Sequence, residues 1–280
     1  MESATEHASN REPDAFLEEV EGAQAMDWVR ERSAETLLAL NAWPSFDETR
    51  QAIQEALDAP GRIPSLSRRG AHLYNFWQDA EHPRGLWRRI PVDAVRQDEP
   101  PWEVLIDLDA LGSSDGIGWT FAGVRALPGH SARVLLCLSR GGADAIELRE
   151  FDVERRVFVT DGFRLPEAKT DATWLNADTL LVGTDLGPGS LTTSGYPRQV
   201  RRWVRGQGIA QAEVIYEGEP SDVSVFVSVD RTPGFERVLF GRSISFYETT
   251  LEEWNDGVLR PLSKPADARL NLWKGHALLE

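Results

Sequence analysis

The sequence predicts a mainly β fold, namely a partial β-propeller that follows two N-terminal α-helices. Helical periodicity is confined to the first 61 residues. After Gly61, short β-rich runs alternate with Gly, Pro and Asp turns up to the last residue. These runs fall into groups of four that recur at roughly 50-residue intervals, which is typical of the four-stranded blades of a propeller.

Residues 1–61 are expected to form a helical segment with two helices. In the first helix, apolar side chains between Met26 and Leu40 step by three or four residues, which places them on one face. The second helix begins with a capping-box pattern, with Ser45 at the N-cap and Glu48 at the third helical position, and it ends at the Pro-Gly of residues 60–61. Both helices are interpreted as elements that pack on a neighbouring domain.

Residues 62–280 are expected to form four complete four-stranded blades and part of a fifth. The groups of strands begin near Ile63, Trp119, Ala172 and Val223, and the fifth begins near Leu270. A β-sandwich with evenly spaced strands is the alternative, and the grouping by four favours the propeller. The expected strands span residues 63–66, 73–77, 86–90 and 104–108; 119–124, 134–138, 145–151 and 157–160; 172–175, 179–182, 199–204 and 213–216; and 223–229, 238–240, 244–247 and 258–262.

Six tryptophans fall on or beside these expected strands. Large rings commonly fill the space between blades, so core packing is their expected role. A stacking platform for a ligand is the alternative. These residues are Trp77, Trp87, Trp102, Trp119, Trp174 and Trp203.

The stretch from residue 183 to residue 203 differs from the other turns. Strand-like runs enter and leave it, and the loop between them is rich in Gly, Ser and Thr and too long for a tight hairpin. Gly187, Gly189 and Gly195 permit backbone angles that are closed to other residues. A long ordered loop is more often functional than not, although a solvated tip without a ligand fits the spacing equally well.

The net charge and the single cysteine limit which binding partners and which cellular compartment are expected for the protein. The net charge of −15 and the pI of about 4.8 argue against nucleic acid and anionic membranes, which need basic patches. Cys137 is the only cysteine and lies in an apolar run, so it is expected to be a small buried hydrophobe. Residues 1–13 show no signal-peptide pattern, and no apolar run approaches membrane-spanning length. A soluble, cytoplasmic protein is the expectation.

The sequence contains none of the catalytic motifs considered below. The sequence has no Gly-x-Ser-x-Gly nucleophile elbow, and the nearest run, 137–141, has Cys137 in place of the first glycine. It has no phosphate-binding loop, no histidines at metal-ligand spacing and no distinctive carboxylate pair. Residues 113–119 look somewhat like the Asp box of sialidases but are better interpreted as a turn. No catalytic centre, metal or cofactor is expected within these residues.

Several runs nevertheless resemble the N-terminal part of prolyl oligopeptidase-type serine peptidases. That family usually opens with Asp-Pro-Tyr-x-Trp-Leu-Glu, whereas here Pro13 precedes Asp14 and Phe16 stands where an aromatic pair is expected. The resemblance covers nearly the whole chain, with the runs in the same order. The matching runs are 14–20, 25–29, 74–79 with 82–87, 138–145 and 183–203.

The resemblance implies a domain plan and an activity. It implies that the helical segment, residues 1–61, packs on an α/β-hydrolase domain, and that residues 62–280 are part of a seven-bladed propeller that gates access of short peptides. The hydrolase domain, with its Ser, Asp and His, is expected to be absent from this chain, which alone would be inactive. The full enzyme would cleave short peptides, with cleavage after proline as one option. A non-catalytic propeller that binds other proteins is the alternative function.

The resemblance also implies where the substrate would lie. In the family, the loops between the second and third strands of each blade lie at the propeller end that faces the hydrolase. Four residues on three such loops are candidates to contact the hydrolase or the substrate, because a guanidinium suits a carboxylate and a tyrosine ring suits an apolar side chain. The alternative is that they only fix loop shape or the interdomain contact. The loops are 78–85, 140–144 and 183–198, and the candidates are Arg84, Arg140, Tyr196 and Arg198.

Overall fold

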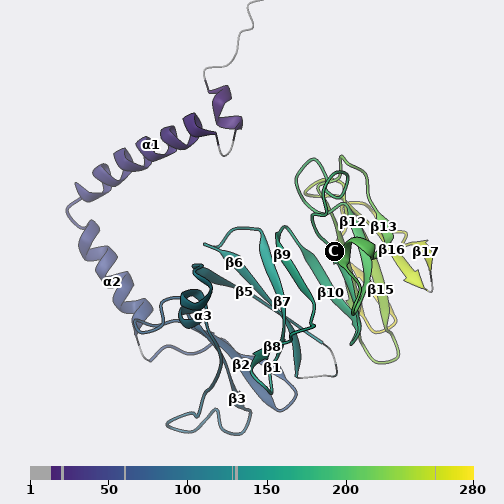
Figure 1. Ribbon diagram of the computed structural model, residues 1–280, viewed down its shortest axis with the longest axis horizontal. Helices are drawn as coiled ribbons and strands as arrows, with labels where there is room; N and C mark the ends of the chain where they lie inside the picture. Colours follow the sequence, from purple (N-terminus) through teal and green to yellow (C-terminus); the bar gives the residue numbers. More distant parts are fainter. Residues whose placement is uncertain (1–13, 20–21, 60, 128, 130–131, 256) are drawn as a thin grey trace, which may run out of the picture. The chain divides into compact units, whose positions relative to one another are not determined.

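A computed structural model describes residues 14–19, 22–59, 61–127, 129, 132–255 and 257–280 (Figure 1). The chain divides into two units, Met1–Arg62 and Ile63–Glu280. Among the described helices, none is long and apolar enough to cross a membrane.

The first unit consists of a 3-10 turn, η1 (Ala15–Glu18), and two helices, α1 (Ala23–Asn41) and α2 (Phe46–Asp58). Helix α2 begins directly after Ser45, as predicted, but the Ser45 side chain makes no hydrogen bond to the helix. The predicted capping-box bond from Ser45 is therefore not formed. Large apolar side chains remain exposed on this unit: Leu37, Leu38, Trp43, Ile53 and Leu57.

The second unit contains a series of antiparallel sheets, in which strands that follow each other in the chain are also neighbours in the sheet, except for β8 and β9 (Figure 1). The first sheet has β1 (Ser67–Arg69), β2 (His72–Trp77), β3 (Leu86–Pro91) and β4 (Glu103–Asp107). The second has β5 (Trp119–Ala126), β6 (Arg133–Arg140), β7 (Ile146–Asp152), β8 (Val157–Phe158) and β9 (Arg164–Ala168). The third has β10 (Asp171–Asn176), β11 (Thr179–Gly183), β12 (Gln199–Val204) and β13 (Glu213–Glu217). The fourth has β14 (Ser224–Asp230), β15 (Arg237–Ser243), β16 (Thr249–Asn255) and β17 (Val258–Pro261), and β18 (Leu270–Trp273) pairs with β19 (His276–Leu279).

Two of the expected strands are wrong. Residues 63–66 are not a strand, and β1 begins four residues later. Residues 244–248 form the loop before β16, closed by a hydrogen bond from the Ile244 N–H to the Glu248 carbonyl at 2.9 Å. The apolar run at 244–247 suggested a strand, but its Phe246 side chain is 89% exposed and does not pack in a sheet.

The second sheet also differs from the expected four strands. Its outer edge is divided between β8, which pairs with the end of β7, and β9, which pairs with the rest of β7. Strand β9 was not predicted. The segment between β8 and β9 follows β7 through hydrogen bonds from Val159 N–H to the Glu150 carbonyl at 3.0 Å and from Glu150 N–H to the Phe163 carbonyl at 2.8 Å.

A third helix, α3 (Leu108–Asp115), connects the first two sheets and includes part of the region interpreted as a turn. The Asp107 carboxylate caps it by accepting hydrogen bonds from the Asp109 and Ala110 N–H groups, at 2.9 and 3.0 Å. Gly116 ends it with a left-handed φ of 67°. The interpretation of residues 113–119 as a turn is therefore wrong for residues 113–115, which form the end of a short helix, and Gly116 is its C-cap.

The apolar core lies between consecutive sheets. One cluster joins the first and second sheets, a second joins the second and third, and a third joins the third and fourth. On β6, Leu136 belongs to the first cluster and its neighbour Leu135 to the second, because alternate side chains of a strand point to opposite faces. This explains why the middle strands are continuous apolar runs, and it buries Cys137, which raises the pKa of its thiol.

Most of the tryptophans pack as predicted. Trp87 and Trp119 lie in the cluster between the first and second sheets, and Trp174 and Trp203 lie in the next one. Trp77 and Trp102 instead make cation–π contacts with Arg88, whose guanidinium lies 4.5 and 4.3 Å from their ring centroids.

Candidate functional site

The loops between the second and third strands of the first three sheets lie beside the connections to neighbouring sheets. We call residues 78–85, 141–145 and 184–198 the rim loops. The alternating strand directions of an antiparallel sheet require this placement. The second and fourth strands run in the same direction, so the loop after the second strand lies at the same end of the sheet as the end of the fourth strand. One backbone hydrogen bond per loop shows it: Leu108 N–H to the Gly85 carbonyl at 3.0 Å, Gly141 N–H to the Gly118 carbonyl at 3.4 Å, and Thr193 N–H to the Pro220 carbonyl at 2.8 Å.

The β11–β12 rim loop has an internal hydrogen-bond network. The Ser190 hydroxyl donates to the Gly187 carbonyl at 2.7 Å and accepts from the Leu186 N–H at 2.9 Å. Gly187 and Gly189 have φ angles of 94° and 83°, which other residues rarely adopt. The glycines thus have the unusual backbone angles that the sequence predicted, and the loop has a defined shape.

Arg198 is held inside this loop. Its guanidinium donates to the Gly189 carbonyl through Nε at 3.0 Å and Nη2 at 2.8 Å, and to the Gly218 carbonyl through Nη1 at 3.2 Å. Nη2 also lies 2.6 Å from Glu217, and only 18% of the side chain is exposed. These contacts use most of the donors of the guanidinium, so in this state Arg198 fixes the loop against the end of β13.

Tyr196 lies on the exposed side of the same loop and reaches the rim loop of the second sheet. Its hydroxyl donates to Asp144 Oδ2 at 3.4 Å. Lys169 Nζ lies 4.1 Å from the ring centroid and 3.8 Å from Asp144 Oδ2. Tyr196 as a whole is 36% exposed, so the structure brings together three segments and leaves part of this residue open to solvent.

Arg140 is engaged at the end of β6. Its Nε lies 2.7 Å from Glu167, and its guanidinium lies 5.2 Å from the Trp119 ring centroid. Arg149 lies 5.1 Å from the same ring, and the indole N–H donates to Asp115 at 2.9 Å. Arg140 is thus one of two arginines that fix this tryptophan.

Burial and hydrogen bonding act in opposite directions on Asp115. Burial raises the pKa of this carboxyl, but hydrogen bonds from Trp119 and Arg149 and the charge of Arg149 outweigh it, so the pKa is below its ordinary value. Asp115 therefore stays ionised near neutral pH and serves as the anchor of the Trp119 cluster.

Arg84 differs from the other two arginines. Its backbone N–H donates to Asp109 at 3.0 Å, but its guanidinium has no hydrogen bond or ion pair with any described residue. It borders a shallow hollow of about 320 Å³ beside α3 and Trp119. A Cβ added at Gly118 would lie 3.1 Å from Arg84 Nη2, so glycine at this position leaves room for the side chain.

Two side chains at the rim loops have surface that is open to solvent among the described residues. Arg84 offers an open guanidinium and Tyr196 an open ring, which suit a carboxylate and an apolar group. Within the described ranges, no three His, Cys, Asp or Glu residues are placed to hold a metal ion. Asp144 and Lys169 were not predicted as partners of Tyr196, because both lie far from it in the chain.

Antiparallel sheets of mostly four strands that follow one another along the chain, with an apolar core between each consecutive pair, are typical of β-propeller domains. Residues 6–247 match the family described as prolyl oligopeptidase, N-terminal beta-propeller domain, and the chain belongs to this family. The resemblance seen in the sequence is thereby confirmed.

Curated relatives and solved structures agree with this assignment. The chain is 37% identical over 250 residues to an uncharacterized peptidase of Sinorhizobium fredii and 36% identical over 226 residues to one of Rickettsia prowazekii. These alignments cover 88% and 78% of this chain but 34% and 31% of the relatives, so the chain spans about a third of their length. A post-proline cleaving enzyme from Rickettsia typhi superposes with a TM-score of 0.86 at 31% identity, covering 94% of this chain and 40% of that one.

Proposed function

We propose that the chain is the substrate-gating propeller part of a cytoplasmic serine peptidase that hydrolyses short peptides after proline. The observation that supports this most strongly is the similarity to the post-proline cleaving enzyme over 94% of the chain. The hydrolytic Ser, Asp and His would lie outside these 280 residues, because the sequence lacks a nucleophile elbow.

Each large sheet of the second unit is, in this proposal, one blade. The first strands of neighbouring sheets, β5, β10 and β14, lie against one another, as the innermost strands of a propeller do. The β18–β19 hairpin would begin a fifth blade of the seven that the family implies. The apolar clusters between consecutive sheets are the packing that blades require.

The helical unit, residues 1–61, would pack on the hydrolase domain. The amphipathic helix α2 has no buried residue, and its Ile53 and Leu57 side chains are 55% and 56% exposed. Apolar side chains on such a helix are stabilised when another surface covers them. The hydrolase domain is the partner that this proposal assigns to them.

The rim loops would face the hydrolase and the peptide. Tyr196 and Arg84 have open surface and are the proposed contacts, with Arg84 suited to a carboxylate. Arg140 and Arg198 already bind Glu167 and Glu217, so their proposed role is to hold the shape of the loops.

Expression of the reading frame beyond residue 280 tests the proposal. The longer protein should cleave a chromogenic peptide after proline, with inhibition by a serine-directed reagent, and the pure 280-residue chain should not. Serine-reagent-sensitive cleavage by the 280-residue chain would contradict the assignment of the hydrolytic residues. A reading frame without a later nucleophile elbow would instead favour a non-catalytic interaction module.

A further inference from the structure

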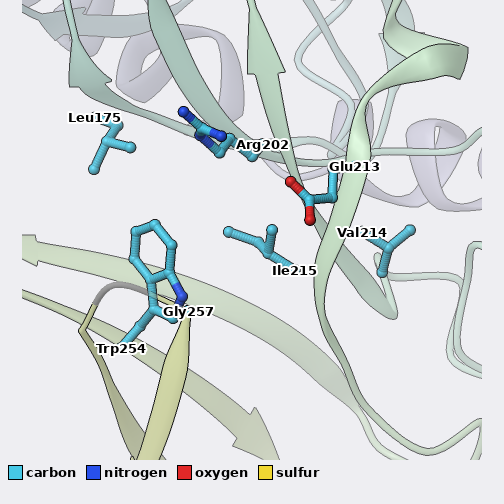
Figure 2. A pocket seen from close by; sticks show the side chains of 7 residues that line it. All are labelled: Leu175, Arg202, Glu213, Val214, Ile215, Trp254 and Gly257. Atoms are coloured by element: carbon cyan, nitrogen blue, oxygen red, sulfur yellow. The ribbon is translucent and has the colours of Figure 1, made fainter.

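A second hollow lies between the outer strands of the third and fourth sheets. It encloses about 750 Å³. Strands β12 and β13 supply one side and β16 with its following turn supplies the other, near the β10–β11 turn. The hollow is thus near the ends of the strands opposite the rim loops. Its lining residues, drawn in Figure 2, are Leu175, Arg202, Glu213, Val214, Ile215, Trp254 and Gly257.

Two opposite charges border this hollow without neutralising each other. Arg202 and Glu213 are direct cross-strand partners on β12 and β13, a position where opposite charges usually attract. Neither side chain has an ion pair or hydrogen bond with any residue in the described part of the chain, and both are exposed. In Figure 2 the guanidinium points toward Leu175, away from the carboxylate. Both charged groups are therefore available to a ligand.

The rest of the lining is apolar. Leu175, Val214, Ile215 and Trp254 contribute the hydrocarbon and aromatic surface, and Ile215 lies between the charged pair and the indole in the view of Figure 2. Trp254 packs on Phe240, with 6.1 Å between the ring centroids, which fixes the indole at the edge of the core. A ligand that fills this space needs an apolar group beside its charges.

In the adjoining hollow, which shares Leu175 and Trp254, both arginines are already engaged. Arg231 donates to the carbonyls of Trp174 and Leu175. Arg237 lies 3.7 Å from Asp230 and donates to the Lys274 carbonyl at 2.8 Å. Arg202 differs from both of these arginines, because its guanidinium has no partner among the described residues and is free to bind a ligand.

We propose that this hollow binds a small zwitterion with an apolar side chain, that is, a free apolar amino acid or a short apolar peptide with free termini. Arg202 receives the carboxylate through its planar fork of donors, and Glu213 receives the ammonium group. The apolar side chain lies against Ile215 and Trp254. The site is distinct from the rim, and the binding does not depend on the proposed hydrolytic function.

Calorimetric titration of the 280-residue chain tests this site with three probes: leucine, the dipeptide Leu-Leu, and Leu-Leu with both termini capped. The uncapped dipeptide or leucine should bind with a saturable isotherm, and the capped peptide should bind at least about tenfold more weakly, because hydrogen bonds to charged groups are lost. Leucine binding as tightly as Leu-Leu assigns the site to free amino acids, and preference for Leu-Leu assigns it to peptides.

Variants then locate the binding. Arg202→Gln and Glu213→Gln should each weaken it about tenfold or more. Arg155→Gln removes an exposed arginine from the β7–β8 turn and should leave it unchanged, as a matched control. Circular dichroism checks that each variant is folded. If one of the two glutamine variants does not fold, the binding measured with the other one tests the proposal. Equal binding of capped and free peptides, unchanged binding in a folded variant, or no saturable binding of either free ligand would overturn the proposal.

Discussion

Two charged residues at corresponding positions of neighbouring sheets differ in whether a charged partner binds them. Glu150 on β7 pairs with Leu135 of β6, and Arg202 on β12 pairs with Leu181 of β11. Each charged residue therefore lies on the third strand of its sheet and faces a leucine of the second strand. Glu150 accepts hydrogen bonds from Arg205, which directly follows strand β12 of the next sheet. Arg202 is met by no charged partner among the described residues and borders the 750 Å³ hollow.

The Glu150 junction is closed by charge and by aromatic packing. The carboxylate, whose side chain is 0% exposed, lies 2.8 Å from Arg205 and 2.6 Å from Arg133, and it accepts from the Phe163 N–H at 2.9 Å. The Phe163 ring contacts Trp174 and Trp203 edge-on. Here a buried charge links two sheets.

The comparison separates two uses of a charge at the same place in a sheet. Removal of a buried carboxylate is destabilising, because it leaves the groups that bind it without their acceptor, even where the intact ion pair adds little net stability. An exposed charge without a partner contributes little to stability and remains available for binding. The junctions should therefore respond differently to mutation, and the following predictions test this from the largest expected effect to the smallest.

Removal of the Glu150 carboxylate should cause the largest loss. Glu150→Ala is expected to lower the free energy of unfolding by about 3 kcal/mol, because Arg133 and Arg205 lose a buried acceptor. Urea denaturation measures the change. Asp161→Ala, which removes an exposed carboxylate from the nearby β8–β9 segment, should change the stability by less than about 0.5 kcal/mol. Equal effects of the two variants would break the comparison.

The Glu150 contribution should also depend on pH. Burial raises the pKa of this carboxyl, but hydrogen bonds from Arg205, the Phe163 N–H and Arg133 outweigh it, so the pKa in the folded chain is below the ordinary 4.5. A depressed pKa means that the stabilisation is complete above pH 4.5 and is lost as the pH falls through the lower, folded value. The difference in urea midpoint between the wild type and Glu150→Gln should therefore be constant from pH 7 to about 5 and shrink in more acidic buffer. A constant difference down to about pH 3, well below the ordinary pKa of 4.5, would contradict this.

The sequence predicts these regions unequally, for physical reasons. Continuous apolar runs such as that around Leu135 and Leu136 identify strands buried on both faces, so the grouping of the middle strands could be predicted. Short edge strands such as β9 and the helix α3 are set by tertiary hydrogen bonds and caps, and both were missed. Nothing near Glu150 in the sequence marks it as a buried charge, because its partner Arg205 is 55 residues away.

The candidate site shows the same limit. The sequence could place the glycines of the β11–β12 loop, since positive φ angles are a local property. It could not tell that Arg198 is held by Gly189 and Glu217 while Arg84 has an open guanidinium. These differences depend on which segments fold next to each loop.

Mutation of Tyr196, which lies between the same two sheets at their rim-loop end, should have an intermediate effect on stability. Tyr196→Ala removes the hydrogen bond to Asp144 and the ring beside Lys169, and it should lower the free energy of unfolding by about 1 kcal/mol. Tyr196→Phe keeps the ring and should retain most of that stability.

In the longer peptidase of the proposed function, Tyr196→Ala and Arg198→Ala should each lower kcat/KM by roughly tenfold, equivalent to about 1.4 kcal/mol of transition-state binding. For Arg198→Ala the expected route is a change in loop shape, whereas for Tyr196→Ala it is loss of the contact itself. Unchanged kinetics in both variants would remove the rim loops from the proposed substrate cavity.

The smallest effect is expected at the open junction. The double variant Arg202→Gln with Glu213→Gln should change the free energy of unfolding by no more than about 0.5 kcal/mol, because both side chains are exposed and neither has a described partner. The same variant should abolish the calorimetric signal for Leu-Leu. A loss of stability above about 1 kcal/mol would mean that these charges act as Glu150 does, by holding two sheets together, and that the hollow is a structural junction. Unchanged stability with lost binding would separate the two junctions by function.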